Sequence, residues 1–166
     1  MIPDSTSSEE NPLSPHWDVE SLLDVALCVM KNASVPLSRF RVGSAVVTET
    51  GRIYEGCNTE SLIPVLSVCA ERNAMNHALI HGESEFLAVA VVSDLYAPLF
   101  PCGACLQYLQ EFSRNSGRDI LIVSQGRSGS RIVTSLEELL KGGFSPDTSV
   151  QEIQQSFSWS PEDKSL

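Results

Sequence analysis

Apolar residues recur at helical spacing in several stretches of the chain, with polar residues between them. This spacing predicts helices over residues 14–33, 69–81, 101–114 and 135–140. Ser14 is the expected N-cap of the first helix, with Pro15 at its first helical position. Ser135 is followed three residues later by Glu138, which is the pattern of a capping box at the start of the last helix.

The segments between these helices have the composition of β-strands. They predict strands at residues 40–47, 52–56, 86–92, 119–124 and 131–133. Thr50 and Gly51 form a turn between the first two strands, which predicts a hairpin. Gly43, inside the first strand, indicates a bulge or the close approach of another backbone segment. The third strand is almost entirely apolar, as is typical of a strand covered on both faces, so we expect an α/β fold with a mixed sheet between helices.

Both ends of the chain differ from its middle in composition. Residues 1–13 are rich in Ser, Glu, Asn and Pro, and we expect a disordered N-terminal tail there. Residues 147–166 are again polar and are expected to form a loosely ordered C-terminal tail. A chain of 166 residues fits a single domain, which we place at residues 14–146. No apolar run approaches the length of a membrane span and the first residues lack a secretory pattern, so we expect a cytoplasmic protein without a membrane partner.

The charge balance narrows the range of partners. The chain has 21 Asp and Glu residues against 11 Lys and Arg residues, which gives a net charge of −10. An acidic surface repels phosphate backbones, and the basic residues are scattered along the chain. A nucleic acid is therefore not expected as a partner, and a small molecule is the expected ligand.

Three of the five cysteines gather in two short motifs at predicted helix starts. Cys69 begins one helix, and Cys102 and Cys105 lie at the start of the next, after Pro101. A helix N-terminus carries partial positive charge, which favours the thiolate form of a cysteine. Thiolates are soft ligands that suit zinc, and a set of three leaves a fourth position open, as in catalytic zinc sites.

Glu71 follows Cys69 by two residues and supplies a carboxylate beside the expected metal. It can take a proton from a water molecule at the open position and return protons to a departing nitrogen. Arg72 can donate a hydrogen bond to a ligand sulfur. A Cys-x-Glu motif followed by Pro-Cys-x-x-Cys is the three-cysteine form of the zinc deaminase signature, so the sequence predicts a hydrolytic deaminase.

The chain resembles the short, homotetrameric form of the cytidine deaminase family over roughly residues 36–146. Beyond the metal motifs, the resemblance is carried by the segments FRVGSA at 40–45, GCNTE at 56–60 and LLKGGFSP at 139–146. The resemblance implies a three-layer α/β/α fold with a mixed five-stranded sheet. It also implies a bound zinc ion, a pyrimidine nucleoside as substrate, and a homotetramer whose active sites are shared between subunits.

The resemblance assigns roles to residues outside the metal motifs as well. Asn58 and Glu60 are expected to bind the ribose hydroxyls, and Phe40 is expected to pack against the pyrimidine ring. The backbone N–H of Ala70 is expected to bind the base carbonyl. Phe144 is expected to reach the base that is bound in a neighbouring subunit.

The expected activity is zinc-dependent hydrolytic deamination of cytidine and 2′-deoxycytidine to the uridines, with release of ammonia, as in pyrimidine salvage. Glu71 is the expected proton shuttle, Arg72 balances the charge of the thiolates, and Gln107, which the family pattern keeps, is expected to support the site. Residues 61–67 depart from the family pattern, which keeps a modified pyrimidine nucleoside or a nucleoside antibiotic open as a substrate. The alternative from another class is a non-catalytic, zinc-stabilised interaction protein, which requires a fourth protein ligand on the metal.

Overall fold

The computed structural model describes residues 17–143, and all structural statements below concern that part of the chain. The helices are α1 (Val19–Val29), α2 (Ala70–Ile80), α3 (Gly103–Ser116) and α4 (Leu136–Leu139), with 3₁₀ turns η1 (Met30–Asn32) and η2 (Pro64–Leu66). The strands are β1 (Val42–Thr48), β2 (Ile53–Cys57), β3 (Phe86–Ser93), β4 (Leu121–Gln125) and β5 (Arg131–Ser135). The predicted hairpin is formed by β1 and β2, and the other predicted elements occur in the expected order.

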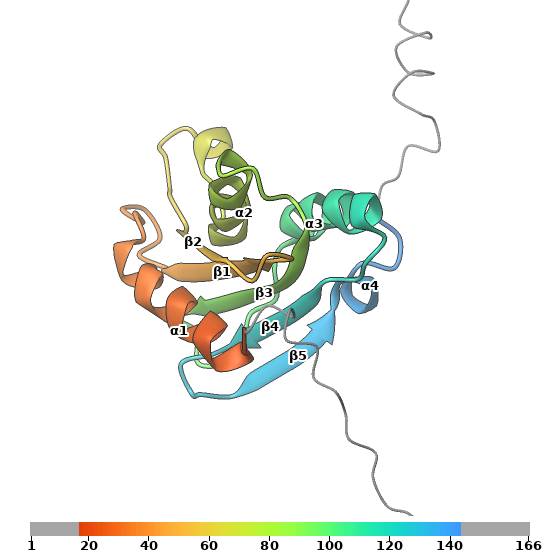
Figure 1. Cartoon of the computed structure of the whole chain (residues 1–166). Helices are drawn as coiled ribbons and strands as arrows, with labels where there is room; N and C mark the ends of the chain where they lie inside the picture. Colours follow the sequence, from red (N-terminus) through yellow and green to blue (C-terminus); the bar gives the residue numbers. More distant parts are fainter. Residues whose placement is uncertain (1–16, 144–166) are drawn as a thin grey trace, which may run out of the picture.

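The strands form one mixed five-stranded sheet, as the family resemblance implies, and their order in it is β2-β1-β3-β4-β5 (Figure 1). β1 is antiparallel to both β2 and β3, β3 is parallel to β4, and β4 is antiparallel to β5. The parallel pair is connected through α3, so the N-terminus of α3 follows the carboxyl end of β3.

Helices cover both faces of this sheet, which confirms the three-layer α/β/α architecture. α1 lies on one face, and α2 and α3 lie on the other, with α4 beside α3 (Figure 1). The core under α1 comprises Leu22, Leu23, Ala26, Ala45, Val47, Ala88, Ala90, Val92 and Val123. Alternate residues of the same strands, among them Val46, Val89 and Ile122, pack under the helices of the opposite face. The inner strands are mostly apolar because both of their faces are buried.

Two glycines allow helices to lie directly on the β1–β2 hairpin. A Cβ atom at Gly43 would lie 2.0 Å from the carbonyl oxygen of Ala26 in α1, so the predicted close approach is confirmed. A Cβ atom at Gly56 would lie 2.2 Å from the backbone nitrogen of Ala74 in α2. Any larger residue at position 56 would push away the helix whose N-terminus carries Cys69.

The predicted starts of the first and last helices differ from the observed ones in detail. α1 begins at Val19, and its N-cap is Asp18, whose Oδ1 accepts from the backbone nitrogen of Ser21 at 2.7 Å. The prediction of a start at Ser14 is therefore wrong, because the Asp18 carboxylate already satisfies the first turn. At α4, Ser135 is the N-cap as predicted and accepts from the backbone nitrogen of Glu138 at 3.3 Å.

Some expectations fall on parts of the chain beyond the described residues. The two expected tails and Phe144 lie there, so the domain boundaries and the role of Phe144 stay predictions. Within residues 17–143, no helix combines the length and the apolar character that crossing a bilayer requires.

Candidate metal centre and active site

The three cysteines of the predicted metal site come together where two helices begin. Cys69 is the N-cap of α2, Cys102 is the N-cap of α3, and Cys105 lies in the first turn of α3. Their Sγ atoms all lie within 4.8 Å of one another. The Sγ–Sγ distance is 3.8 Å between Cys69 and Cys102 and 3.5 Å between Cys102 and Cys105.

The donor set and its spacing fit a zinc ion. Tetrahedral zinc with Zn–S bonds of about 2.3 Å places its sulfur ligands about 3.8 Å apart, which matches the observed spacing. Among residues 17–143, the cluster contains these three thiols and no fourth His, Cys or carboxylate ligand. The geometry is therefore that of an open three-ligand site rather than a closed structural one.

The thiols are arranged so that negative charge is stabilised on them. The pKa of Cys69 is lowered to about 5, chiefly by its hydrogen bond with the Cys105 thiol and then by Arg72 and Cys102. The pKa of Cys105 is raised, because its thiol donates to Cys69 and is buried. The metal-free protein therefore favours a thiolate on Cys69, at the positive end of α2.

Arg72 lies behind Cys69 and provides the nearest positive charge. Its Nη2 is 3.4 Å from the carbonyl oxygen of Ser67, to which it donates, and 4.0 Å from the Sγ of Cys69. Its Nε is buried and has no hydrogen-bond partner among the described residues. Gln107 and Arg72 line the same groove between α2 and α3, which has a volume of about 350 Å³, so the structure brings these two predicted residues together.

Glu71 is buried beside the thiols, with only 4 % of its surface exposed. Burial raises the pKa of its carboxyl to about 7, and the negative charge of Cys69 acts in the same direction. Because its carboxylate oxygens are not among the clustered ligand atoms, Glu71 is available for proton transfer. A group with a pKa near neutrality both accepts and donates protons efficiently at neutral pH.

The predicted ribose-binding residues hold backbone groups of the preceding segment. Asn58 Oδ1 accepts from the nitrogen of Val42 at 2.8 Å, and Asn58 Nδ2 donates to the carbonyl oxygen of Phe40 at 2.9 Å. Glu60 Oε2 accepts from the nitrogens of Leu37 and Ser38, at 2.8 and 3.1 Å. No local pattern in the sequence indicates these bonds, since they join residues 16 or more positions apart.

Phe40 and Ala70 both belong to the core on the face of the sheet that α2 and α3 cover. Phe40 is partly buried and packs on the core cluster that contains Ala70 and Leu106. Ala70 is the first residue of α2 and is fully buried. Asn73, which the sequence did not single out, anchors this end of α2 because its Nδ2 donates to the carbonyl oxygen of Cys57 at 2.7 Å.

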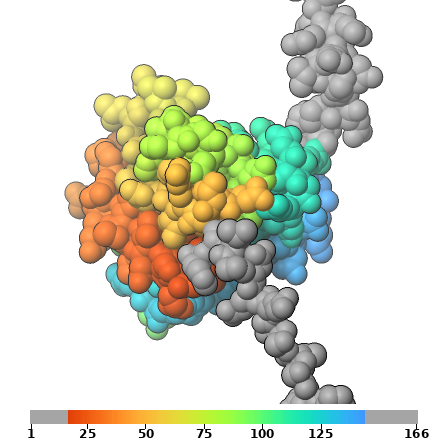
Figure 2. Space-filling view, viewed as in Figure 1, coloured from red at the N-terminus to blue at the C-terminus, as the bar shows by residue number. Residues whose placement is uncertain are grey.

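The loop that leads into Cys69 presents apolar side chains to solvent. Leu62 and Val65 are 86 % and 85 % exposed, and Ile63 and Leu66 are more than half exposed. In Figure 2 this loop forms the yellow protrusion at the edge of the molecule. Exposed apolar groups in such a concentration are typical of a surface that another molecule covers.

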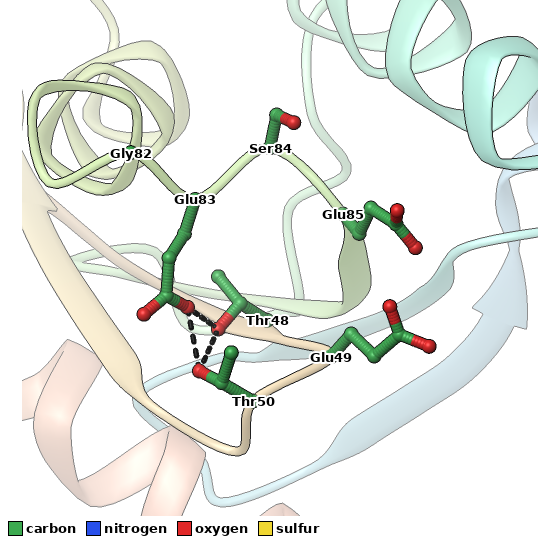
Figure 3. Close-up of a pocket in the computed structure, with 7 residues that line it drawn as sticks. All are labelled: Thr48, Glu49, Thr50, Gly82, Glu83, Ser84 and Glu85. Atoms are coloured by element: carbon green, nitrogen blue, oxygen red, sulfur yellow. Dashed lines mark hydrogen bonds between the residues drawn. The ribbon is translucent and has the colours of Figure 1, made fainter.

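A second cavity, of about 200 Å³, lies at the opposite end of α2 (Figure 3). It is lined by Thr48, Glu49, Thr50, Gly82, Glu83, Ser84 and Glu85. The Glu83 side chain turns towards Thr48 and Thr50 and accepts hydrogen bonds from both hydroxyls. These bonds tie the β1–β2 hairpin to the chain beyond α2, and the cavity contains none of the predicted site residues.

Comparison with known proteins agrees with this site. The family model for the cytidine and deoxycytidylate deaminase zinc-binding region matches residues 17–116. The cytidine deaminase of Sporosarcina psychrophila is 38 % identical over 130 residues, which are 78 % of this chain and 93 % of that protein. The probable cytidine deaminase of Dictyostelium discoideum is 34 % identical over 139 residues, 83 % of this chain and 91 % of that protein.

Solved structures give the same result. The crystal structure of cytidine deaminase from Burkholderia pseudomallei is 36 % identical and superposes with a TM-score of 0.72, covering 77 % of this chain and 100 % of that chain. The cytidine deaminase from Mycobacterium tuberculosis is 30 % identical, with a TM-score of 0.65 over 79 % of this chain and 100 % of that chain. On this similarity and on the three-cysteine centre, the chain belongs to the zinc-binding cytidine and deoxycytidylate deaminase family.

Proposed function

We propose that the protein is a zinc-dependent hydrolase that converts cytidine and 2′-deoxycytidine to uridine and 2′-deoxyuridine with release of ammonia. The observation that carries this proposal is the meeting of three thiols from two helix N-termini beside a buried carboxyl. A closed structural site has no use for a proton carrier next to an open position, whereas hydrolysis requires one.

Cys69, Cys102 and Cys105 hold the zinc ion in this proposal, and Arg72 offsets part of their negative charge. When bound, zinc supplies a Lewis acid that lowers the pKa of water and so provides a nucleophile at neutral pH. The N-termini of α2 and α3 point their backbone N–H groups towards the same region, which further offsets the charge of the thiolates.

Glu71 moves the protons of the reaction. Its carboxylate accepts a proton from water while the water oxygen bonds to C4 of the pyrimidine. It then delivers that proton to ring nitrogen N3. Glu71 next takes the remaining hydroxyl proton at C4 and passes it to the amino group, so that the C4–N4 bond breaks with loss of ammonia and the C4 carbonyl forms. Burial keeps the pKa of Glu71 at about 7, so one residue serves in both directions.

The remaining residues hold the nucleoside. The hydrogen bonds described above use one N–H of the Asn58 amide and the oxygen Oε2 of Glu60. The second N–H of Asn58 and the oxygen Oε1 of Glu60 can therefore offer a donor and an acceptor to a ribose hydroxyl. Phe40 packs against the pyrimidine, and the backbone N–H of Ala70 binds the base carbonyl. Gln107 supports the ligand helix α3 from the groove that it shares with Arg72.

We also propose a cytoplasmic homotetramer that acts in pyrimidine salvage and whose sites are shared between subunits. The exposed apolar loop Ser61–Ser67 leads directly into Cys69, so a second subunit that covers it lies against the active site. Phe144 of a neighbouring subunit would then complete the pocket around the base. The mass of the assembly in solution tests this part of the proposal.

Ammonia release from a nucleoside panel, together with metal analysis, tests the function. We expect the purified full-length protein to contain zinc and to deaminate cytidine and 2′-deoxycytidine. Cys102→Ser should lose both zinc and activity, whereas Cys28→Ser, which changes an exposed cysteine outside the cluster, should lose neither. Zinc-loaded protein that is inert on the whole panel would contradict the proposal and favour a non-catalytic role. Turnover of only a modified nucleoside would point to the alternative substrate.

A further inference from the structure

The chain that leads from η1 into β1, residues 34–42, is joined at both of its ends to residues 58–60. Its backbone bonds at both ends: the nitrogen of Ser34 donates to the carbonyl oxygen of Asn58 at 3.1 Å, and the nitrogen of Asn58 donates to the carbonyl oxygen of Val42, also at 3.1 Å. The nitrogen of Glu60 returns a bond to the carbonyl oxygen of Ser34 at 2.8 Å. The two expected ribose-binding residues are therefore built into the support of this segment.

The side chains of Asn58 and Ser38 fix the two polar backbone groups of Phe40. Asn58 Nδ2 donates to the carbonyl oxygen of Phe40, and Asn58 Oδ1 accepts from the nitrogen of Val42. The nitrogen of Phe40 donates to the Oγ of Ser38 at 2.9 Å. The backbone of Phe40 is thus held on both sides by side chains rather than by a strand.

Glu60 holds the turn that precedes Phe40. Its Oε2 accepts from the nitrogens of Leu37 and Ser38. Hydrogen bonds from Ser38 and Leu37 lower the pKa of Glu60, so it is ionised at neutral pH and these bonds are charge-assisted. The turn also holds Arg39 at φ 58°, a left-handed conformation that a non-glycine residue adopts only when its surroundings impose it.

We propose that Asn58 and Glu60 are positioning residues, whose side chains clamp residues 37–42 and thereby place Phe40 against the pyrimidine. This inference rests on the proposed function and deepens it, because the same two residues then link recognition of the ribose to placement of the base. The clamp bonds reach Phe40 itself and residues on either side of it, and Phe40 is partly buried against the core cluster that contains Ala70. A substitution at Asn58 should therefore weaken the binding even of a nucleoside that lacks the 2′ and 3′ hydroxyls.

Competition by 2′,3′-dideoxycytidine tests the clamp, since this nucleoside lacks the 2′ and 3′ hydroxyls. We expect Asn58→Ala to raise the inhibition constant of 2′,3′-dideoxycytidine against cytidine turnover about tenfold. A change of this size corresponds to the loss of one to two hydrogen bonds that position Phe40. Asn32→Ala, the same change at an exposed asparagine in η1, should leave that constant unchanged. An unchanged constant in Asn58→Ala, together with a raised KM for cytidine, would show a ribose contact alone and overturn the inference.

A double-mutant cycle with Phe40→Ala shows whether Asn58 acts through Phe40. The clamp predicts that Asn58→Ala and Phe40→Ala together cost clearly less in kcat/KM than the product of the two single losses. Independent ribose and base contacts would instead give multiplicative losses. Glu60→Gln provides a second, isosteric variant, for which the same cycle with Phe40→Ala should also be non-multiplicative.

Hydrogen exchange in the free protein separates failure of the clamp from failure of the proposed function. The amide of Val42 should exchange faster in Asn58→Ala, and the amides of Leu37 and Ser38 should exchange faster in Glu60→Gln. This result is expected whether or not the wild-type protein deaminates cytidine. Unaltered exchange at these amides would overturn the clamp, whereas an inert wild-type protein with altered exchange would overturn only the proposed function.

Discussion

Glu71 and Glu83 lie at opposite ends of α2, and desolvation acts to raise the pKa of both carboxyls, yet their pKa values shift in opposite directions. Glu71 is buried, with 4 % of its surface exposed, whereas Glu83 is only partly buried. The pKa of Glu71 is raised to about 7, chiefly by burial. Burial acts on Glu83 in the same direction, but hydrogen bonds from Thr48, Thr50 and Tyr54 and the charge of Arg52 outweigh it, so its pKa is lowered.

The difference between these two carboxyls shows that burial alone does not decide what a carboxyl does. The Glu83 carboxylate accepts hydrogen bonds from four side chains, including Thr50 at 2.6 Å, Arg52 at 3.0 Å and Tyr54 at 3.1 Å. These bonds connect the β1–β2 hairpin to the chain that follows α2. Glu71 lies next to a thiolate instead and keeps its carboxyl for exchange of protons. The hydrogen-bond partners of a carboxyl, together with its burial, thus decide whether it stabilises the structure or exchanges protons.

The largest expected effect is on turnover. Glu71→Gln should lower kcat for cytidine by about 10²–10⁴-fold, because the amide cannot accept the proton of water. Zinc content should stay at the wild-type level, since Glu71 is not among the clustered ligand atoms. Glu83→Gln is the matched control at the other end of α2 and should retain turnover close to that of the wild type. Equal losses of kcat in the two variants would contradict a special role of Glu71 in proton transfer.

The next effect is a pH dependence of stability with opposite signs at the two sites. In metal-free protein, the folded pKa of Glu71 is raised from 4.5 to about 7, so its contribution to stability falls as the pH rises through this interval. The free energy of unfolding of wild type relative to Glu71→Gln should fall by up to about 3 kcal/mol between pH 4.5 and 7. Urea unfolding at several pH values measures this difference, and a flat difference would contradict the raised pKa.

Glu83 should behave in the opposite way. Its folded pKa is lowered below 4.5, so its contribution is fully present above that pH and is lost as the pH falls through the folded pKa. At neutral pH, Glu83→Gln should lower the free energy of unfolding by about 1–3 kcal/mol, since charge-assisted bonds from Thr48, Thr50 and Tyr54 are weakened. A variant as stable as wild type at neutral pH would show that these bonds contribute nothing net.

Local sequence patterns were sufficient for much of the fold and for the centre of the site. The apolar run at β3, the turn at Gly51 and the helix starts at Cys69 and Cys102 all appear as predicted. At Gly43 the prediction was a bulge or the close approach of another backbone segment; the structure shows the close approach, and its partner, the backbone of Ala26, was not predicted. These features depend on residues near one another in the chain, whose spacing carries the signal.

Local sequence patterns could not predict hydrogen bonds between residues that are distant in the chain. Asp18 was missed for a different reason: its capping bond to Ser21 is local, but Ser14 and Pro15 offered a plausible earlier start of the helix. The bonds of Glu83 to Thr48 and of Asn58 to Phe40 join residues that are 35 and 18 positions apart, and no local spacing marks them.

The sequence by itself determined that three thiols and a carboxyl stand at helix starts, and hence the kind of chemistry. Only the tertiary structure decided which carboxyl is kept for that chemistry and which backbone the ribose residues hold. The physical reason is that a side chain's pKa and its hydrogen-bond partners depend on burial and on neighbours contributed by other parts of the chain. For Glu71, packing of α2 and α3 on one face of the sheet provides both, and it raises the pKa of an ordinary glutamate to about 7.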